Sequence, residues 1–178
     1  MRPVLRSVLA LAWIPLAGCV ATHDGQAAAR DIVRDEFPDA QEAVRSAILE
    51  LNEIVARGDW EGLRAAHLES PKFSDVGTSL HRSDFEEMIQ AEVAAIQAMN
   101  IKQIDWRDLR VDVFGDVAVS TVFPVYSGMD EDGGAIDVEA VVTFVHVSTP
   151  EGWKIAHEHV TLVEEGVPTL PSSREPAN

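Results

Sequence analysis

Cysteine is almost absent from this chain, because Cys19 is the only one among its 178 residues. A single cysteine cannot form a disulfide within the chain, so the fold must be held together by its hydrophobic core. The chain also lacks a nucleophile elbow, a phosphate-binding loop, a dinucleotide-binding fingerprint and any cysteine-based metal motif. These absences argue against ATP-driven and nicotinamide-dependent chemistry, and we expect no cofactor.

Basic residues are also scarce, since 14 lysines and arginines stand against 30 aspartates and glutamates, a formal net charge of −16. Residues 1–18 contain two of the arginines and no acidic residue, so the chain after them has 12 basic residues and a formal charge of −18. Such a surface repels nucleic acid and anionic lipid headgroups. We therefore expect no nucleic-acid partner, and solubility is the simplest explanation of the charge.

The amino-terminal hydrophobic run, residues 8–17, is too short to span a bilayer. It follows Arg2 and Arg6, an arrangement typical of a secretory signal peptide covering residues 1–18. Residues 16–19 then read Leu-Ala-Gly-Cys, which resembles the bacterial lipobox. The resemblance implies cleavage before Cys19 and acylation of that residue, which would tether the chain to a membrane. The alternative is an ordinary cleaved signal peptide followed by a chance cysteine.

The residue after the cysteine bears on location. Val20 stands where an aspartate would, in Gram-negative lipoproteins, favour retention in the inner membrane. The resemblance therefore implies a lipid-anchored protein of the cell envelope, on the periplasmic face of the outer membrane. Residues 19–38 are small and polar and are expected to form a tether, and residues 164–178 a disordered tail.

Three helices are predicted between residues 39 and 100. Apolar residues at helical spacing, among them Val44, Ile48 and Leu51, indicate a first helix over residues 39–58. Asp59 can cap a second, shorter helix that carries His67, which we expect to be half-exposed. Residues 83–86 read as a capping box that opens a third helix, ending near residue 100.

After residue 100 the hydrophobic period changes from 3.6 to 2, which indicates strands. Four strands are predicted at residues 102–114, 117–129, 135–147 and 153–162, and residues 72–79 form an earlier strand-like patch. Short loops between neighbours favour an antiparallel meander. Helices followed by strands predict one α+β domain over residues 39–163, with the helices packed on a curved antiparallel sheet.

The end of this domain carries a family resemblance. Residues 153–161 read Trp-Lys-Ile-Ala-His-Glu-His-Val-Thr, and residues 56–59 read Ala-Arg-Gly-Asp at the junction of the first two helices. Together with the order of elements, these motifs resemble the SnoaL-like branch of the nuclear transport factor 2-like fold, also called the cystatin-like α+β cone. The resemblance implies a pocket between sheet and helices and a homodimer formed through the sheet. Activities in that fold range from isomerase, dehydratase and cyclase to ligand binding alone.

Asp75 is the first candidate for chemistry. When the chain is aligned with the ketosteroid isomerases through Gly58 and Asp59, Asp75 falls where their general base lies, and a carboxylate in an apolar pocket can abstract a proton from carbon. Those enzymes also use a tyrosine of the first helix as an oxyanion donor, and that position is Leu51 here. The alternative role for Asp75 is a turn or pocket-rim residue.

Histidines of the last two strands form a second group. If Ser148 pairs with Trp153 in the final hairpin, His146 shares a face with His157 and His159. Three imidazoles on one face could bind zinc or copper with an added carboxylate. Hydrogen-bonded pocket or interface histidines are the simpler interpretation, so we expect no metal site.

The leading hypothesis is a lipid-anchored envelope protein whose pocket binds a small, partly apolar ligand without strong catalysis. Alternatives are an isomerase, dehydratase or hydrolase with Asp75 or His159 as general base, and a structural or partner-binding lipoprotein. The residues expected to line the pocket are Trp60, His81, Trp106, Tyr126 and His157.

Overall fold

The computed structural model describes residues 31–77, 81–130 and 132–163. The predicted signal peptide, Cys19, most of the predicted tether and the predicted tail lie outside these residues. The described chain forms the following helices and strands: α1 (Pro38–Arg57), α2 (Trp60–Ala66), β1 (Ser74–Val76), α3 (Phe85–Ala98), β2 (Gln103–Phe114), β3 (Val117–Met129), β4 (Ala135–Thr149) and β5 (Gly152–Leu162). None of the described helices combines the length and the apolar character needed to cross a membrane.

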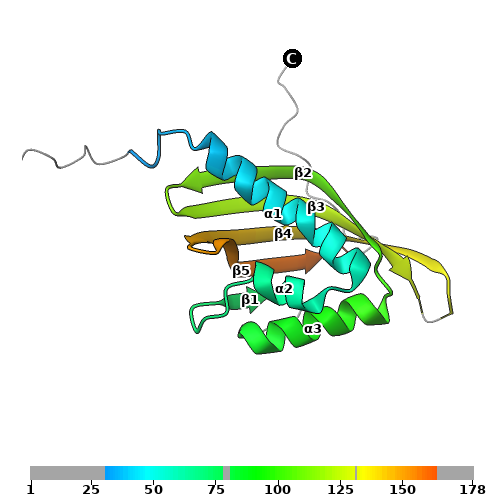
Figure 1. Ribbon diagram of the computed structural model, residues 1–178. Helices are drawn as coiled ribbons and strands as arrows, with labels where there is room; N and C mark the ends of the chain where they lie inside the picture. Colours follow the sequence, from blue (N-terminus) through cyan, green and yellow to red (C-terminus); the bar gives the residue numbers. More distant parts are fainter. Residues whose placement is uncertain (1–30, 78–80, 131, 164–178) are drawn as a thin grey trace, which may run out of the picture. The chain divides into compact units, whose positions relative to one another are not determined.

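The strands form one sheet in the order β1-β5-β4-β3-β2 (Figure 1). The antiparallel meander of β2 to β5 and the α+β class are confirmed. The predicted strand-like patch shortens to β1, which pairs in parallel with β5, so the sheet is mixed rather than wholly antiparallel. α1 packs against β2 and β5, α2 packs against β5, and α3 packs against β1.

The junction between α1 and α2 follows from local sequence. Gly58 ends α1 in the left-handed conformation (φ 65°), where a residue with a Cβ is strained. The side chain of Asp59 then accepts a hydrogen bond from the backbone N–H of Gly62 at 2.9 Å and so caps α2. The predicted helix-turn-helix is therefore present, and its turn orients α2 toward β5.

The capping box of α3 lies one residue later than predicted. Asp84 accepts from the backbone N–H of Glu87 at 3.0 Å, and the Glu87 carboxylate accepts from the backbone N–H of Asp84 at 3.3 Å. Ser83 instead exchanges two backbone hydrogen bonds with Asp75. This bridge holds Ser83 against β1, and the adjacent Asp84 takes the capping position.

A bulge in β5 decides which side chains face the helices. The predicted register is correct, because Ser148 pairs with Trp153 and His146 with Ile155. However, Val145 pairs with His157, so Ala156 is an extra residue in β5. Because neighbouring residues on a strand face opposite ways, the extra residue places His157 and His159 on the face opposite His146. The prediction that the three histidines share a face is wrong.

The hydrophobic core lies between the helices and the inner face of the sheet. Ile48 of α1 and Val142 of β4 have no exposed surface, and Phe144 is 2% exposed. Each such side chain contributes about 1.5–3 kcal/mol to folding. Phe123 and Val141 face the other way and remain exposed. The sheet therefore has one buried face and one open face.

Candidate functional site

A cavity of about 300 Å³ lies between the helices and the inner face of the sheet. Its lining is mostly apolar and includes Leu51 of α1, Met88 of α3, and Phe144 of β4. Val160 and Leu162, beyond the bulge in β5, complete the strand side. An apolar cavity of this size, with a few polar groups, is the usual form of a small-molecule site.

The polar groups of this cavity come from elements distant in the sequence. His67 follows α2, Asp75 lies in β1, Glu92 lies in α3, and Glu158 lies in β5. Tyr126 of β3 lines the same cavity, and burial raises the pKa of its hydroxyl above the ordinary value. One apolar cavity thus contains an imidazole, three carboxyl groups and a phenol.

His67 is the best-fixed member of this group, and only 3% of the residue is exposed. Its Nδ1 donates to the backbone carbonyl of Leu63 at 2.8 Å, and its Nε2 lies 3.4 Å from Oε2 of Glu158. Burial alone would lower the pKa of His67, but the hydrogen bond to Glu158 and the charges of Glu92 and Glu158 raise it to about 9. Without a bound ligand or ion, the ring is therefore an imidazolium at neutral pH.

Glu92 takes a core-facing position of α3, four residues after Met88 and four before Ile96. The residue as a whole is half-buried, but its Oε2 is fully enclosed and has no hydrogen-bond partner among the described residues. Burial of this carboxyl group raises the pKa of Glu92 to about 7. The negative charge of Glu158 adds to the increase, and the positive charge of His67 opposes it.

Trp106 supplies a second orphaned polar atom to the cavity. Its Nε1 is buried and has no hydrogen-bond partner in the described part of the chain. Indole nitrogens are usually paired when buried, because an unpaired donor loses its bond to water. The cavity thus offers a ligand one N–H donor and one carboxyl oxygen that the protein itself leaves unused.

Three of the predicted site residues, Asp75, Trp106 and Tyr126, do line this cavity. Burial, followed by the charge of Glu158, raises the pKa of Asp75, although nearby histidines oppose the shift. A carboxylate in this position could take a proton from a bound molecule, which keeps it a candidate base.

The other predicted residues do not line the cavity. His157 faces away because of the bulge, and its Nδ1 lies 2.9 Å from both Oγ and the carbonyl oxygen of Ser74. His159 is on the same outer face and is exposed, as is His81 before α3. Trp60 packs against the core at the start of α2.

Sequence reasoning missed His67, Glu92 and Glu158. The signal for Glu92 was present, because an acidic residue at an apolar position of an amphipathic helix faces the core. Glu158 was hidden, because strict alternation along β5 places it on the face opposite Ile155. His67 ends a short helix, and nothing in its local sequence shows that β5 covers it. Its backbone forms a parallel bridge with Ile155, so the ring is buried rather than half-exposed.

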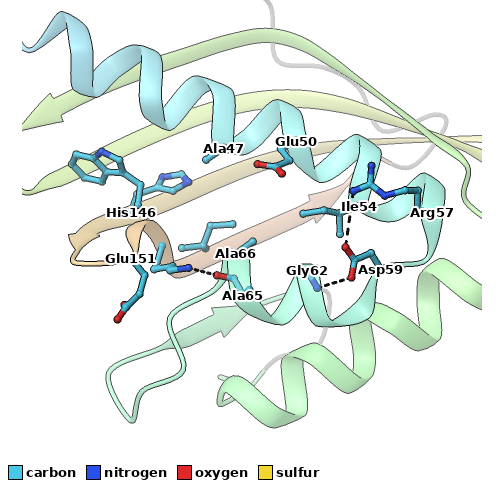
Figure 2. Close-up of a pocket in the computed structure, with 13 residues that line it drawn as sticks. Ala47, Glu50, Ile54, Arg57, Asp59, Gly62, Ala65, Ala66, His146 and Glu151 are labelled. Carbon is cyan, nitrogen blue, oxygen red and sulfur yellow. Dashed lines mark hydrogen bonds and ion pairs between the residues drawn. The ribbon is translucent and has the colours of Figure 1, made fainter.

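A second cavity of about 350 Å³ lies between α1, α2 and the β4–β5 hairpin (Figure 2). His146 borders it with 1% of its surface exposed, and neither ring nitrogen has a partner among the described residues. Burial, with a smaller effect from His67, lowers the pKa of His146 to about 4, so the ring is neutral. Many of the remaining lining residues are charged, and some already form hydrogen bonds within the chain. Lys154 donates to the carbonyl of Ala65, and Asp59 caps α2. We therefore take the more apolar cavity, which His67, Glu92 and Glu158 line, as the candidate site.

Comparison with solved structures identifies the fold as NTF2-like, with a cystatin-like topology. A candidate dehydratase of the NTF2-like family from Streptomyces avermitilis has a TM-score of 0.61 and 24% identity, covering 71% of this chain and 99% of that one. An NTF2-like protein from Novosphingobium aromaticivorans has a TM-score of 0.60 and 18% identity, covering 72% and 84%. A CaMKII hub from S. rosetta has a TM-score of 0.55 and 21% identity, covering 72% and 99%.

These identities are low and show the fold alone. The sequence itself gives the family, because residues 44–163 match the model of the SnoaL-like domain. The chain therefore belongs to the SnoaL-like domain family, as the closing strand and the α1–α2 junction indicate. No curated protein matches the sequence.

Proposed function

We propose that this domain binds a small, mostly apolar molecule in the cavity between its helices and sheet, with one polar end of that molecule at His67, Glu92 and Trp106. The observation that carries the proposal is the pair of orphaned polar atoms, Glu92 Oε2 and Trp106 Nε1, in one apolar cavity. A ligand that satisfied both would remove the cost of burying them unpaired, about 1–3 kcal/mol each. The cavity volume also favours this proposal over a purely structural role.

The test is native mass spectrometry of the protein purified from its own host, followed by denaturation to identify any released molecule. Val160→Phe replaces a small side chain of the cavity lining with a larger aromatic one. Val141→Phe makes the same replacement on the exposed face of the sheet and is the matched control. We expect a molecule in the wild type and in Val141→Phe, and its loss in Val160→Phe. Equal occupancy in both variants would place the molecule elsewhere.

A second candidate function is acid–base catalysis, and the position of Asp75 in the same cavity favours it. A carboxylate there could act as the general base of an isomerase, dehydratase or hydrolase. His159 has no part in this candidate, because it is exposed on the outer face. Asp75→Asn should stop turnover of the molecule released from the cavity and leave its binding largely intact. Asp116→Asn, at an exposed turn, is the control and should change neither turnover nor binding. Turnover that survives Asp75→Asn excludes this role.

The membrane anchor is a separate part of the proposal. Its support is the Leu-Ala-Gly-Cys run at residues 16–19 and the signal-like segment before it. We propose acylation of Cys19 and a location on the periplasmic face of the outer membrane. Cys19→Ser should move the protein from the membrane fraction to the soluble fraction, and mass spectrometry of the amino terminus should show loss of the acyl chains. An unchanged distribution would contradict the anchor.

A homodimer through the outer face of the sheet completes the proposal. The exposed side chains of Phe123 and Val141 support it, because apolar groups on an open sheet face are suited to a partner surface. Phe123→Asp should lower the mass measured by light scattering from that of two chains to that of one. A wild-type protein that is already monomeric at high concentration would contradict the dimer.

A further inference from the structure

Three potential metal ligands converge at one end of the cavity. They are His67, after α2, Glu92 of α3, and Glu158 of β5, and one ligand atom from each lies within 4.8 Å of the other two. His67 and Glu158 are buried residues, and the Glu92 Oε2 atom is enclosed without a hydrogen-bond partner in the described chain. The three groups come from separate elements, so the packing of the domain fixes their spacing.

The orientation of His67 suits coordination. Its Nδ1 donates to the carbonyl of Leu63 at 2.8 Å, which directs Nε2 toward the two glutamates. Metal-binding histidines commonly have this arrangement, in which one ring nitrogen donates to a carbonyl and the other is presented to the ion. Leu63 and His67 are held one helical turn apart by α2, so the ring direction is set before any ion binds.

The distance between His67 and Glu158 also suits metal coordination. Their nearest atoms are 3.4 Å apart, whereas a charge-assisted hydrogen bond is usually about 2.7–2.9 Å long. Two ligand atoms that each lie about 2.0–2.2 Å from a tetrahedral ion are separated by roughly 3.4 Å. The pair is therefore too far apart for a strong direct bond and correctly spaced for a shared ion.

We infer that His67, Glu92 and Glu158 bind one divalent transition-metal ion of the zinc class, with an open coordination position toward the cavity. One imidazole and two carboxylates form a mixed nitrogen and oxygen set that suits zinc and its neighbours, whereas calcium prefers six to eight oxygens. The ion would offset two buried negative charges and bind the orphaned Glu92 oxygen, so the small molecule would reach Glu92 through the ion and pair directly with Trp106 Nε1. Binding would displace any proton on these groups.

The inference rests on the proposed function in one respect, because the open position faces the space where the small molecule would lie. The ion would polarise an oxygen of that molecule or of water. Metal binding itself needs no ligand, so the two proposals can fail separately. Val160→Phe should abolish occupancy by the small molecule while leaving the ion in place, since Val160 lines the cavity but is not one of the three ligands.

The test is titration of the purified, chelator-treated chain with Co²⁺, followed by visible absorption, with Zn²⁺ as competitor. Native mass spectrometry in a non-chelating buffer gives the stoichiometry. We expect one Co²⁺ per chain, a visible band that Zn²⁺ abolishes, and affinity lowered by about 10–100-fold or more in Glu92→Gln. His159→Gln is the matched control, because it removes an exposed histidine of the same strand and should bind as the wild type does.

Circular dichroism of every variant shows whether it is folded, and Glu158→Gln replaces Glu92→Gln if the latter does not fold. The inference is overturned if the folded wild-type chain takes up no stoichiometric Co²⁺ or Zn²⁺. It is also overturned if Co²⁺ binds with equal affinity in the wild type and in the folded glutamine variant. Equal weakening in His159→Gln would assign binding to the outer histidines instead.

Discussion

The ring of His67 lies 3.4 Å from the carboxylate of Glu158, although 91 positions separate these residues in the chain. The bulge at Ala156 turns Glu158 inward, and the parallel bridge between His67 and Ile155 holds the ring beside β5. The central pair of the candidate site therefore depends on the packing of the last strand rather than on a local motif.

Acid should destabilise the protein through His146. The pKa of its buried ring is about 4, below the ordinary 6.5, so between these values the unfolded chain takes up a proton that the folded chain does not. The free energy of unfolding should then fall by ~1.4 kcal/mol per pH unit, about 3 kcal/mol over the window. Urea unfolding of the wild type and His146→Leu at pH 4.5, 5.5, 6.5 and 7.5 isolates this contribution from the carboxyl groups. A difference between the two proteins that does not change with pH would contradict it.

Gly128 allows β3 to pass close to the end of α3. A Cβ at this position would collide with the backbone carbonyl of Met99, which cannot rotate away as a side chain can. Gly128→Ala should therefore lower the free energy of unfolding by about 1–3 kcal/mol. At Gly77 a Cβ would meet only the side chain of Asp75 at 3.5 Å, so Gly77→Ala should be neutral or slightly stabilising. Similar urea midpoints for the two variants would show that β3 and Met99 are further apart than described.

Two neighbouring valines test which face of the sheet is buried. Val142 has no exposed surface, whereas Val141 is 38% exposed. In the monomeric Phe123→Asp background, Val142→Ala should reduce the free energy of unfolding by about 1–3 kcal/mol, and Val141→Ala should change it by less than about 0.5 kcal/mol. Thermal or urea unfolding of both proteins checks the result. Equal losses in this background would mean that Val141 is buried within the single chain.

The capping box at the start of α3 should contribute measurably to stability. Asp84→Ala removes the acceptor for the Glu87 N–H and should cost about 1 kcal/mol. Ser83→Ala leaves the box intact, although Ser83 is itself a common capping residue. Urea unfolding gives the free energy of unfolding of each variant. A larger decrease in Ser83→Ala than in Asp84→Ala would indicate that Ser83 is the capping residue, as the sequence predicted.

Trp106 should contribute to ligand affinity through its unpaired N–H. Trp106→Phe keeps an aromatic ring in the cavity and removes this donor. The loss of one hydrogen bond should weaken binding of the molecule released from the cavity by about tenfold. Trp153→Phe is the control, because Trp153 does not line this cavity. Calorimetric titration with that molecule gives the two affinities, and an unchanged affinity in Trp106→Phe would mean that the donor is not used.

The fold could be predicted from the sequence because its signals are local. Helical spacing in α1, the cap at Asp59 and the change of period after residue 100 each act over a few residues. β1 was harder to place, since three residues carry little periodicity and their partner is at the far end of the domain. The bulge at Ala156 was not predictable, because no glycine or proline marks it. The histidines were therefore assigned to the wrong face even though the hairpin register was correct.

Some residues of the candidate site could be predicted from the sequence, and others could not. Asp75, Trp106 and Tyr126 were predicted to be at the pocket, and they line the cavity. His67 and Glu158 were not predicted, because their burial depends on contacts between distant segments. Glu92 could have been recognised by its place on the apolar side of α3.

The parallel pairing of β1 with β5 joins Ser74 to His157, 83 residues later. A nascent chain that ends before Gly152 would contain α1 to α3 and the β2–β4 hairpins, but neither Glu158 nor the strand that buries His67. Binding of the proposed small molecule therefore requires the final strand, so copies that end before Gly152 should not bind it.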